Sequence, residues 1–271
     1  MSAQPTLSVT EVRNALRCPR VFALGRKGGP TVAFPIGASS LGALFHRIVE
    51  VFTRGVDDPP AALRSLDRRA SRGAVEQALS RWLLAPLVVE LERAAKLATI
   101  ASEVDDLAEA LRAFAVYLAG EIATSSAAPA EALGALLEHS ELAVEMMVQP
   151  GEGPAVRLTG RIDAVHARAS GALDVVEYKL TDEANDELDR AQVALYRYLL
   201  RGSLDMHAEP VILRFNPALT VTRLEGRDAD ALVDERLLPL LDRMIAWADA
   251  PETAPATTRR DLCPACPVRV R

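Results

Sequence analysis

The segment V-V-E-Y-K-L, residues 175–180, places an acid and a lysine two residues apart. Residues two apart on a β-strand point from the same face, so Glu177 and Lys179 should project together. If this strand pairs with the preceding one around a turn centred on Ser170, residues whose numbers sum to about 340 lie opposite each other. Asp163 then faces Glu177. The sequence therefore predicts two carboxylates and one ammonium group on one face of a β-hairpin.

This arrangement has a specific chemical use. Carboxylates bind hard cations such as Mg²⁺, which polarise a phosphate and lower the pKa of a bound water. A nearby lysine can orient that water or neutralise charge that develops on the phosphate. Glu145, on the strand before, is a further candidate for the metal site. Alone, an E-x-K triplet is more often an exposed strand face with a cross-strand Glu–Lys pair.

His46 lies in a helix predicted over residues 37–54. Gly42, His46 and Glu50 are each four residues apart, so they lie along one helix face. A neutral imidazole can ligate a metal or form a hydrogen bond with a phosphate. A helical histidine is more often structural, and no second histidine follows to give the H-E-x-x-H pattern of zinc proteases.

Gln192 and Tyr196 are four residues apart in a helix predicted over residues 182–201, with Gly202 as its C-terminal cap. Such side chains can bond phosphates or base edges and can stack on bases. The alternative is a polar helix surface with a partly buried tyrosine.

The remaining pattern predicts the elements that position these residues. Ser8 and Glu11 form a capping box for a helix that should end near Cys18, because a proline follows. Residues 58–138 are rich in Ala, Leu and Arg with helical periodicity, and Pro86 should kink or break one of these helices. Strands are predicted over residues 141–148, 156–167, 173–180, 210–216 and 221–224, and a last helix over 228–248. The result is a mixed α/β core with a helical insertion.

Composition excludes some classes of protein. Hydrophobic residues make up 49% of the chain and charged residues 25%, which is typical of a globular protein. No uncharged apolar stretch approaches the roughly 20 residues of a membrane span, and the N-terminus lacks a signal pattern, so we expect a cytoplasmic protein without membrane contact. The net charge is −6, yet residues 1–47 contain six basic residues and one acid. A local basic surface of this kind can hold phosphates on an acidic protein, although any single arginine can equally belong to a solvated face. The basic residues are Arg13, Arg17, Arg20, Arg26, Lys27 and Arg47.

Taken in order, the stretches GALFHRIVE, LTGRIDAV, VVEYKL and QVALYRY resemble the RecB-like branch of the PD-(D/E)XK nuclease superfamily. That branch includes the nuclease domains of RecB and AddB and the CRISPR-associated RecB-like exonucleases. The resemblance implies a restriction-endonuclease-like mixed sheet flanked by helices. It implies a DNA exonuclease that uses Mg²⁺ or Mn²⁺ and acts on single strands or DNA ends. The implied roles are metal or phosphate contact for His46, metal ligation for Asp163 and Glu177, catalysis for Lys179, and DNA contact for Gln192, Tyr196 and Arg161.

The three cysteines fit the same comparison. Iron–sulfur members of this branch carry one cysteine before the nuclease core and three after it, the latter spaced C-x2-C-x5-C. Cys18 matches the first ligand, and Cys263 and Cys266 match the next two. The spacing puts the fourth at position 272, beyond this chain, so a 4Fe–4S cluster would need a further ligand. Zinc on the Cys263–Cys266 pair is the competing interpretation.

We therefore expect four regions and two possible settings for the protein. Residues 1–36 form an N-terminal helix with the first cluster cysteine, residues 37–54 and 139–250 the nuclease core, residues 55–138 the helical insertion, and residues 251–271 the cysteine tail. The chain acts as a nuclease, alone or with a helicase or CRISPR integrase, fused or separate. The alternative is a nuclease-fold module that binds DNA or assembles such a complex without cleaving. No phosphate-binding loop for ATP hydrolysis occurs in the sequence.

Overall fold

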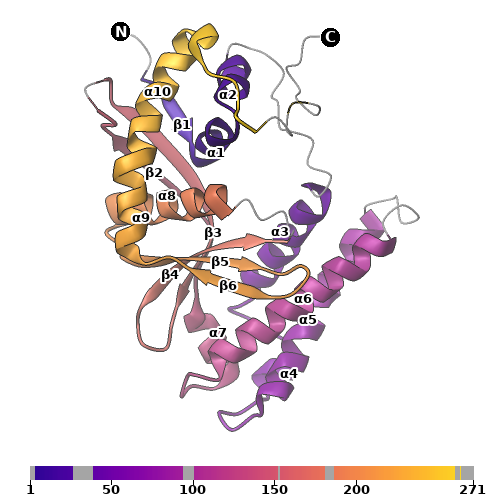
Figure 1. The fold of residues 1–271 in the computed structure, drawn as a ribbon. Coiled ribbons are helices and arrows are strands. Elements are labelled where there is room, and N and C mark those ends of the chain that lie inside the picture. The colour runs from indigo at the N-terminus through magenta and orange to yellow at the C-terminus, as the bar shows by residue number, and fades with distance from the viewer. Residues whose placement is uncertain are drawn as a thin grey trace.

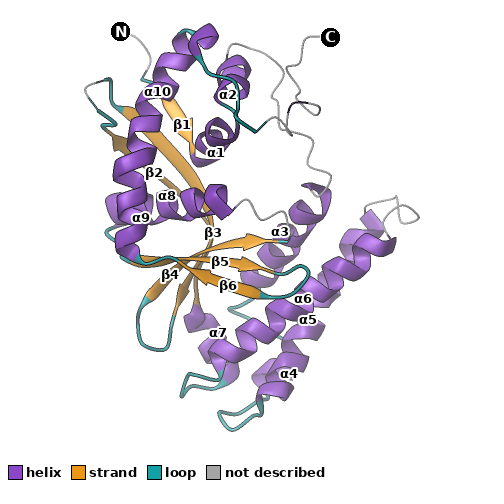
Figure 2. Ribbon diagram, in the orientation of Figure 1, coloured by secondary structure: helices purple, strands orange, loops and turns teal. Residues whose placement is uncertain are grey.

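The computed structural model describes residues 4–26, 39–93, 101–151, 153–180, 186–259 and 263. Within these residues a mixed β-sheet lies between two sets of helices (Figures 1 and 2). This is the mixed α/β core flanked by helices that the sequence predicts. The strands are β1 (Thr6–Ser8), β2 (Leu137–Val148), β3 (Val156–Ala167), β4 (Leu173–Lys179), β5 (Ala208–Arg214) and β6 (Thr220–Arg223).

Strand β3 is the strand on which the sheet divides. Strand β2 runs antiparallel to it over almost its whole length, along one edge. The other edge is shared, because β1 pairs in parallel with residues 157–159 and β4 pairs antiparallel with residues 164–167. Strand β5 then pairs in parallel with β4, and β6 pairs antiparallel with β5. Residues 160–163 of β3 therefore lie between the points where β1 and β4 leave it.

Each face of the sheet packs against its own helices. On β4, Val176 and Tyr178 join the core of a first set of helices, whereas Val175 joins the core of a second set on the other face. This alternation follows from the two-residue period of a strand. The helices of the first face are α3 (Ser39–Arg54), α4 (Ala61–Arg64), α5 (Arg72–Arg93), α6 (Ala101–Ile122) and α7 (Pro129–Leu136); those of the second are α1 (Val9–Arg17), α2 (Pro19–Arg26), α8 (Asp186–Leu204), α9 (Gly226–Leu232) and α10 (Leu238–Asp249).

The N-terminal helix begins and ends as its sequence predicts. Ser8 caps α1 in a capping box with Glu11, and Cys18 is the residue after its last turn. The chain after α10 returns to this helix, since Thr257 Oγ1 donates a hydrogen bond to the carbonyl oxygen of Arg17 at 2.8 Å. Residues close to both ends of the sequence are thereby brought together.

One detail of the predicted helices is wrong, and of the two alternatives at Pro86, a kink or a break, the break does not occur. Gly202 does not cap α8, which continues to Leu204 and is followed by Asp205 with a φ of 54°. Gly202 instead allows close packing, because a Cβ there would lie 2.6 Å from Met146 Sδ. Pro86 does not break its helix, because α5 runs through it. In the described part of the chain, no helix is long and apolar enough to cross a membrane.

Candidate active site

Asp163 lies at the point where the sheet divides. The β3–β4 ladder follows the predicted register from Ala167–Leu173 to Ala164–Val176, the last pair before Asp163. One residue further, Asp163 Oδ2 accepts a hydrogen bond from the backbone N–H of Tyr178 at 2.8 Å. The carboxylate thus bonds the partner strand directly, and Asp163 and Glu177 are neighbours across the end of the hairpin.

Glu177, Lys179 and Gln192 form a compact polar group. Lys179 Nζ lies 2.5 Å from Glu177 Oε1 and donates to Gln192 Oε1 at 3.1 Å. The Gln192 amide in turn donates to Glu177 Oε1 at 2.8 Å and to Tyr196 Oη at 3.2 Å. Helix α8 therefore crosses the end of β4 so that the i, i+4 pair faces the acid and the lysine. Gln192 and Tyr196 are both buried, so their predicted contact with DNA stays a prediction.

Among the described residues, no group forms a hydrogen bond with the second oxygen of Glu177. The side chain is 4% exposed, and Oε2 is buried. A buried unpaired carboxylate oxygen is costly, and in native proteins it commonly marks a place where an ion or water binds.

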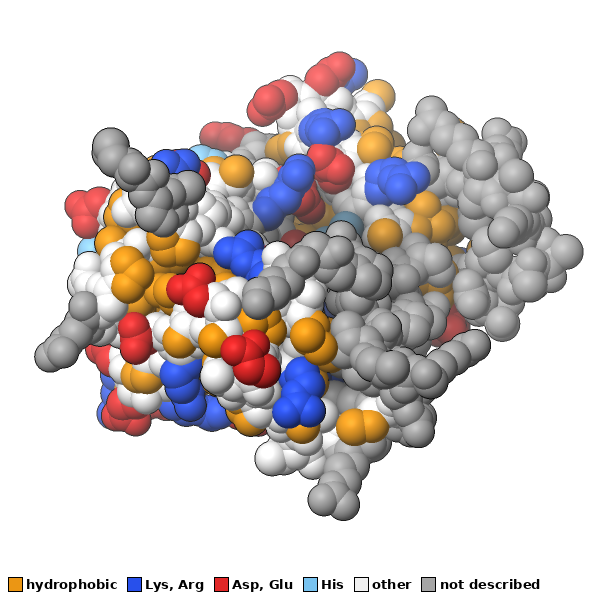
Figure 3. Space-filling model, turned by 90° about the horizontal axis from the view of Figure 1, so that it is seen from above, with side chains coloured by type: hydrophobic (Ala, Val, Ile, Leu, Met, Phe, Trp, Pro, Cys, Tyr) orange, Lys and Arg blue, Asp and Glu red, His pale blue; other side chains and the backbone are white. Residues whose placement is uncertain are grey.

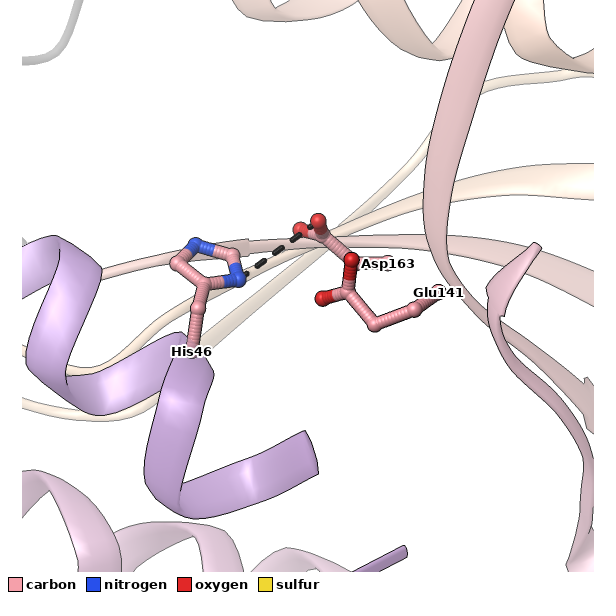
Figure 4. A group of neighbouring side chains, drawn as sticks. All are labelled: His46, Glu141 and Asp163. Carbon is pink, nitrogen blue, oxygen red and sulfur yellow. Dashed lines mark ion pairs between the residues drawn. The ribbon is translucent and has the colours of Figure 1, made fainter. Parts of the chain in front are cut away.

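His46, Glu141 and Asp163 form a second group beside the first (Figure 4). One ligand atom from each lies within 4.8 Å of the others, and His46 Nδ1 is 3.5 Å from Asp163 Oδ1. Imidazole and carboxylate donors together can hold a divalent cation. His46 comes from α3, Asp163 from β3 and Glu141 from β2, so three elements distant in sequence supply this group.

Glu141 has an unusual backbone conformation. Its φ of 51° lies in the left-handed region, which is costly for a residue with a side chain. On β2 its neighbours Ser140 and Leu142 pair with Ala164 and Ile162, so Glu141 stands opposite Asp163. Non-glycine residues in this conformation cluster at functional sites, where the surrounding structure holds them.

Burial and crowding shift the pKa values of this site. The pKa of Asp163 is raised well above its usual value, first by burial and then by the negative charge of Glu177. Burial lowers the pKa of His46, against the opposing effect of Glu177. A neutral imidazole is the form that ligates metal. The raised pKa of Asp163 reflects burial together with more negative charge than the protein alone neutralises easily, whereas the lowered pKa of His46 reflects burial.

Glu145 lies differently from expectation, whereas the predicted DNA contact of Arg161 stays a prediction. Glu145 is exposed and 3.7 Å from Arg157, away from the metal-ligating group, whereas Glu141 occupies that place. Counting back from a β2–β3 turn centred on residue 152 would have put Glu141 opposite Asp163. Arg161 is 64% exposed, and its Nε lies 2.6 Å from Glu141 Oε2, so this cation borders the site.

The cysteines are only partly described. Cys18 is buried at the end of α1, and Cys263 is exposed. Cys266 lies outside the described residues. The fold brings Thr257 to the residue before Cys18, which places the beginning of the tail near the first cysteine.

The geometry can be compared with known proteins at this point. The sequence model of the PD-(D/E)XK nuclease superfamily matches residues 6–271, almost the whole chain. The chain belongs to this superfamily. Its mixed sheet flanked by helices is consistent with the restriction-endonuclease-like fold, and nucleases of this superfamily use divalent metals. The acidic group around Asp163 is a candidate for such a metal site.

Similarity to individual proteins is low. A solved structure of a protein called SSO0001 is 12% identical and covers 91% of this chain and 78% of its own, with a TM-score of 0.38. A "Putative exonuclease" from Eubacterium rectale is 10% identical and covers 98% of this chain and 90% of its own, with a TM-score of 0.47. No curated protein matches the sequence.

Proposed function

We propose that this nuclease is a divalent-metal-dependent deoxyribonuclease, an exonuclease that acts on single-stranded DNA or DNA ends. The observation that carries the proposal is the unpaired Oε2 of Glu177 beside the group of His46, Glu141 and Asp163. The exonuclease action and the DNA substrate rest on the resemblance of four sequence stretches to RecB-like nucleases. The same resemblance supports a helicase or CRISPR integrase as partner.

The donor set fits Mg²⁺ or Mn²⁺. Asp163 and Glu177 would hold the cation, with His46 and Glu141 as further ligands, because oxygen donors and one imidazole suit these metals. A cation there would satisfy the buried Glu177 Oε2 and offset the burial and the repulsion from Glu177 that together raise the pKa of Asp163. When bound, it would polarise the scissile phosphate and lower the pKa of a water.

The chain's own residues account for the remaining requirements. Lys179 has three N–H donors, of which Glu177 and Gln192 take two. The third can face the attacking water or a phosphate oxygen and stabilise charge that develops in the transition state. Gln192 bonds both Glu177 and Lys179, so it fixes their spacing. Asp163 holds the end of β4 through the Tyr178 N–H and so orients the same group.

Cleavage of end-labelled single- and double-stranded DNA with Mg²⁺ or Mn²⁺ tests the proposal. Lys179→Ala should lower kcat by about 10²–10³-fold, the usual effect of removing one transition-state donor. The product ladder separates exonuclease from endonuclease action. If folded wild-type protein with bound metal cleaves nothing, the enzyme proposal is wrong, and a DNA-binding or assembly module becomes the better description.

We also propose that the two chain ends bind an iron–sulfur cluster. The support is the proximity of the tail to α1, where Thr257 contacts the residue before Cys18. Cys18, Cys263 and Cys266 would be three of the ligands, and a 4Fe–4S cluster normally takes four thiolates. Iron and sulfide analysis of anaerobically purified protein, with Cys18→Ser as the matched variant, tests this. Zinc without sulfide would contradict it and indicate a zinc site instead.

A further inference from the structure

One arginine of the basic N-terminal segment reaches the active site. Arg13, on α1, places Nη2 at 2.8 Å from Asp189 Oδ1. The same oxygen lies 3.8 Å from Lys179 Nζ. Arg13 Nη2 and Lys179 Nζ are therefore no further apart than the sum of these two distances. A helix near the start of the chain thus supplies a cation beside the lysine at the end of β4.

Asp189 is well fixed without Arg13. Its side chain is 2% exposed, and Oδ2 accepts a hydrogen bond from Arg214 Nη2 at 2.8 Å. Arg214 is itself 10% exposed, so this pair forms the buried anchor. Arg13 is 33% exposed, so part of its guanidinium lies within reach of a ligand from solvent. Because Arg214 already neutralises Asp189, Arg13 is an additional cation at this carboxylate.

The face of the molecule viewed in Figure 3 supports a substrate-binding role for basic residues at this end. In the middle of that face, acidic side chains and a histidine lie in a recess with Lys and Arg side chains around it. A guanidinium has five N–H donors, and the bond to Asp189 uses one. Its planar fork suits the bidentate binding of a phosphate.

We infer that Arg13 is a substrate-binding residue that contacts the phosphate next to the cleaved one, and that Asp189 positions it relative to Lys179. This inference rests on the proposed function. Charges on one DNA strand follow each other at roughly 3.4 Å of helix rise. A cation this close to Lys179 can therefore reach only the cleaved phosphate or its neighbour. Asp189 shares one oxygen between both cations and so sets their separation.

The test measures binding of a single-stranded oligonucleotide, without divalent metal, over a range of salt concentrations. Each phosphate contact on a single strand contributes about 0.7 to the slope of log K against log salt. Arg13→Ala should therefore weaken binding and reduce the slope by about 0.7, and Arg13→Lys should keep the slope. Arg26→Ala is the matched control, because Arg26 is also 33% exposed and pairs with Glu11 at 3.1 Å. Its slope should equal that of the wild type.

The positioning role of Asp189 is tested by a double-mutant cycle. If Asp189 acts through Arg13, Arg13→Ala should change the salt slope little in an Asp189→Asn background. Thermal unfolding shows whether the Asp189→Asn variants fold. If they do not, the salt slopes of Arg13→Ala and Arg13→Lys alone decide whether Arg13 binds a phosphate. An unchanged slope in Arg13→Ala, or an equal decrease in Arg26→Ala, would overturn the inference. Because no cleavage is measured, a failure of the proposed function would appear separately, in the Lys179→Ala assay.

Discussion

Strand β4 carries a buried charged group near each of its ends, and the two differ in how their charges are neutralised. Near its start, Asp174 is 1% exposed, with Oδ1 3.1 Å from Arg168 Nη2 and Oδ2 2.7 Å from Arg223 Nη1. At its end, Glu177 has one oxygen bonded to Lys179 and Gln192 and the other oxygen unpaired. The first group has a cation within ion-pair distance of each carboxylate oxygen, although Asp174 Oδ1, like Glu177 Oε2, forms no hydrogen bond with the described residues. The second has more acid than the protein neutralises.

Two histidines, His166 and His46, differ in the same way as the two acidic groups. His166, on β3, is fully buried, and each ring nitrogen contacts a tyrosine hydroxyl: Tyr117 at 3.3 Å and Tyr178 at 3.0 Å. His46 faces Asp163 in the candidate metal site. Charged groups that support a fold meet opposite charges within the protein, whereas groups that bind a ligand keep uncompensated charge for it. The same strand and its neighbours thus provide both a structural polar group and a candidate functional one.

The largest effect that we expect is a loss of folding stability when Asp174, near the start of β4, is substituted. Asp174→Asn leaves two arginines without their buried anion, and removing one partner of a buried pair costs about 3–5 kcal/mol. We expect the lower end, because Arg168 and Arg223 are 33% and 39% exposed and can be partly hydrated. Urea unfolding measures the change. Cleavage per folded molecule should remain that of the wild type, and its loss would mean that this group is not purely structural.

The second prediction is that metal binding depends on the charged group at the end of β4 and not on the group near its start. A ligand that binds only the folded state stabilises it by about 2.7 kcal/mol at a hundred times its Kd. Mg²⁺ or Mn²⁺ should therefore raise the Tm of the wild type and of Asp174→Asn, but not that of Asp163→Asn. Without metal, Asp163→Asn should not be less stable than the wild type, because it removes the repulsion from Glu177. A metal-induced shift retained in Asp163→Asn would place the metal elsewhere.

The two glutamates of β2 provide the closest matched pair within the functional end. Glu141 belongs to the candidate metal-ligating group and Glu145 does not, although both lie on the same strand. Glu141→Gln should lower metal affinity or kcat by about 10–100-fold, as loss of a supporting group at a metal site commonly does. Glu145→Gln should match the wild type. Equal effects of the two substitutions would show that proximity to Asp163 is irrelevant.

This pair also indicates how far the sequence determines the site. The two-residue period of a strand and a central turn were enough to predict that Asp163 and Glu177 meet, because both residues lie on one short hairpin. Glu141 was missed because Glu145 was the acid chosen on β2, although a β2–β3 turn centred on residue 152 puts Glu141 opposite Asp163. Asp189 was missed because its partners Arg13 and Arg214 come from α1 and β5, far away in the sequence. Local pattern predicts local neighbours, whereas long-range packing decides which buried acid meets which arginine.

The smallest predicted effect concerns the paired histidine. Burial, and then the positive charge of Arg223, lower the pKa of His166 to about 3. Below the unfolded pKa of about 6.5, the unfolded chain takes up a proton that the folded protein does not, so stability from this residue is present above that pH and is lost as the pH falls towards 3. At pH 5 the loss should be about 2 kcal/mol, since each pKa unit corresponds to about 1.36 kcal/mol. Urea unfolding between pH 7 and pH 5 should show this dependence weakened in His166→Asn and unchanged in His207→Asn, whose histidine is 70% exposed. An unchanged dependence in His166→Asn would mean that His166 is protonated in the folded protein. In that case the hydroxyls of Tyr117 and Tyr178 would both accept hydrogen bonds from a charged imidazole ring. His166 would then be a buried charge, and the contrast with His46 would fail.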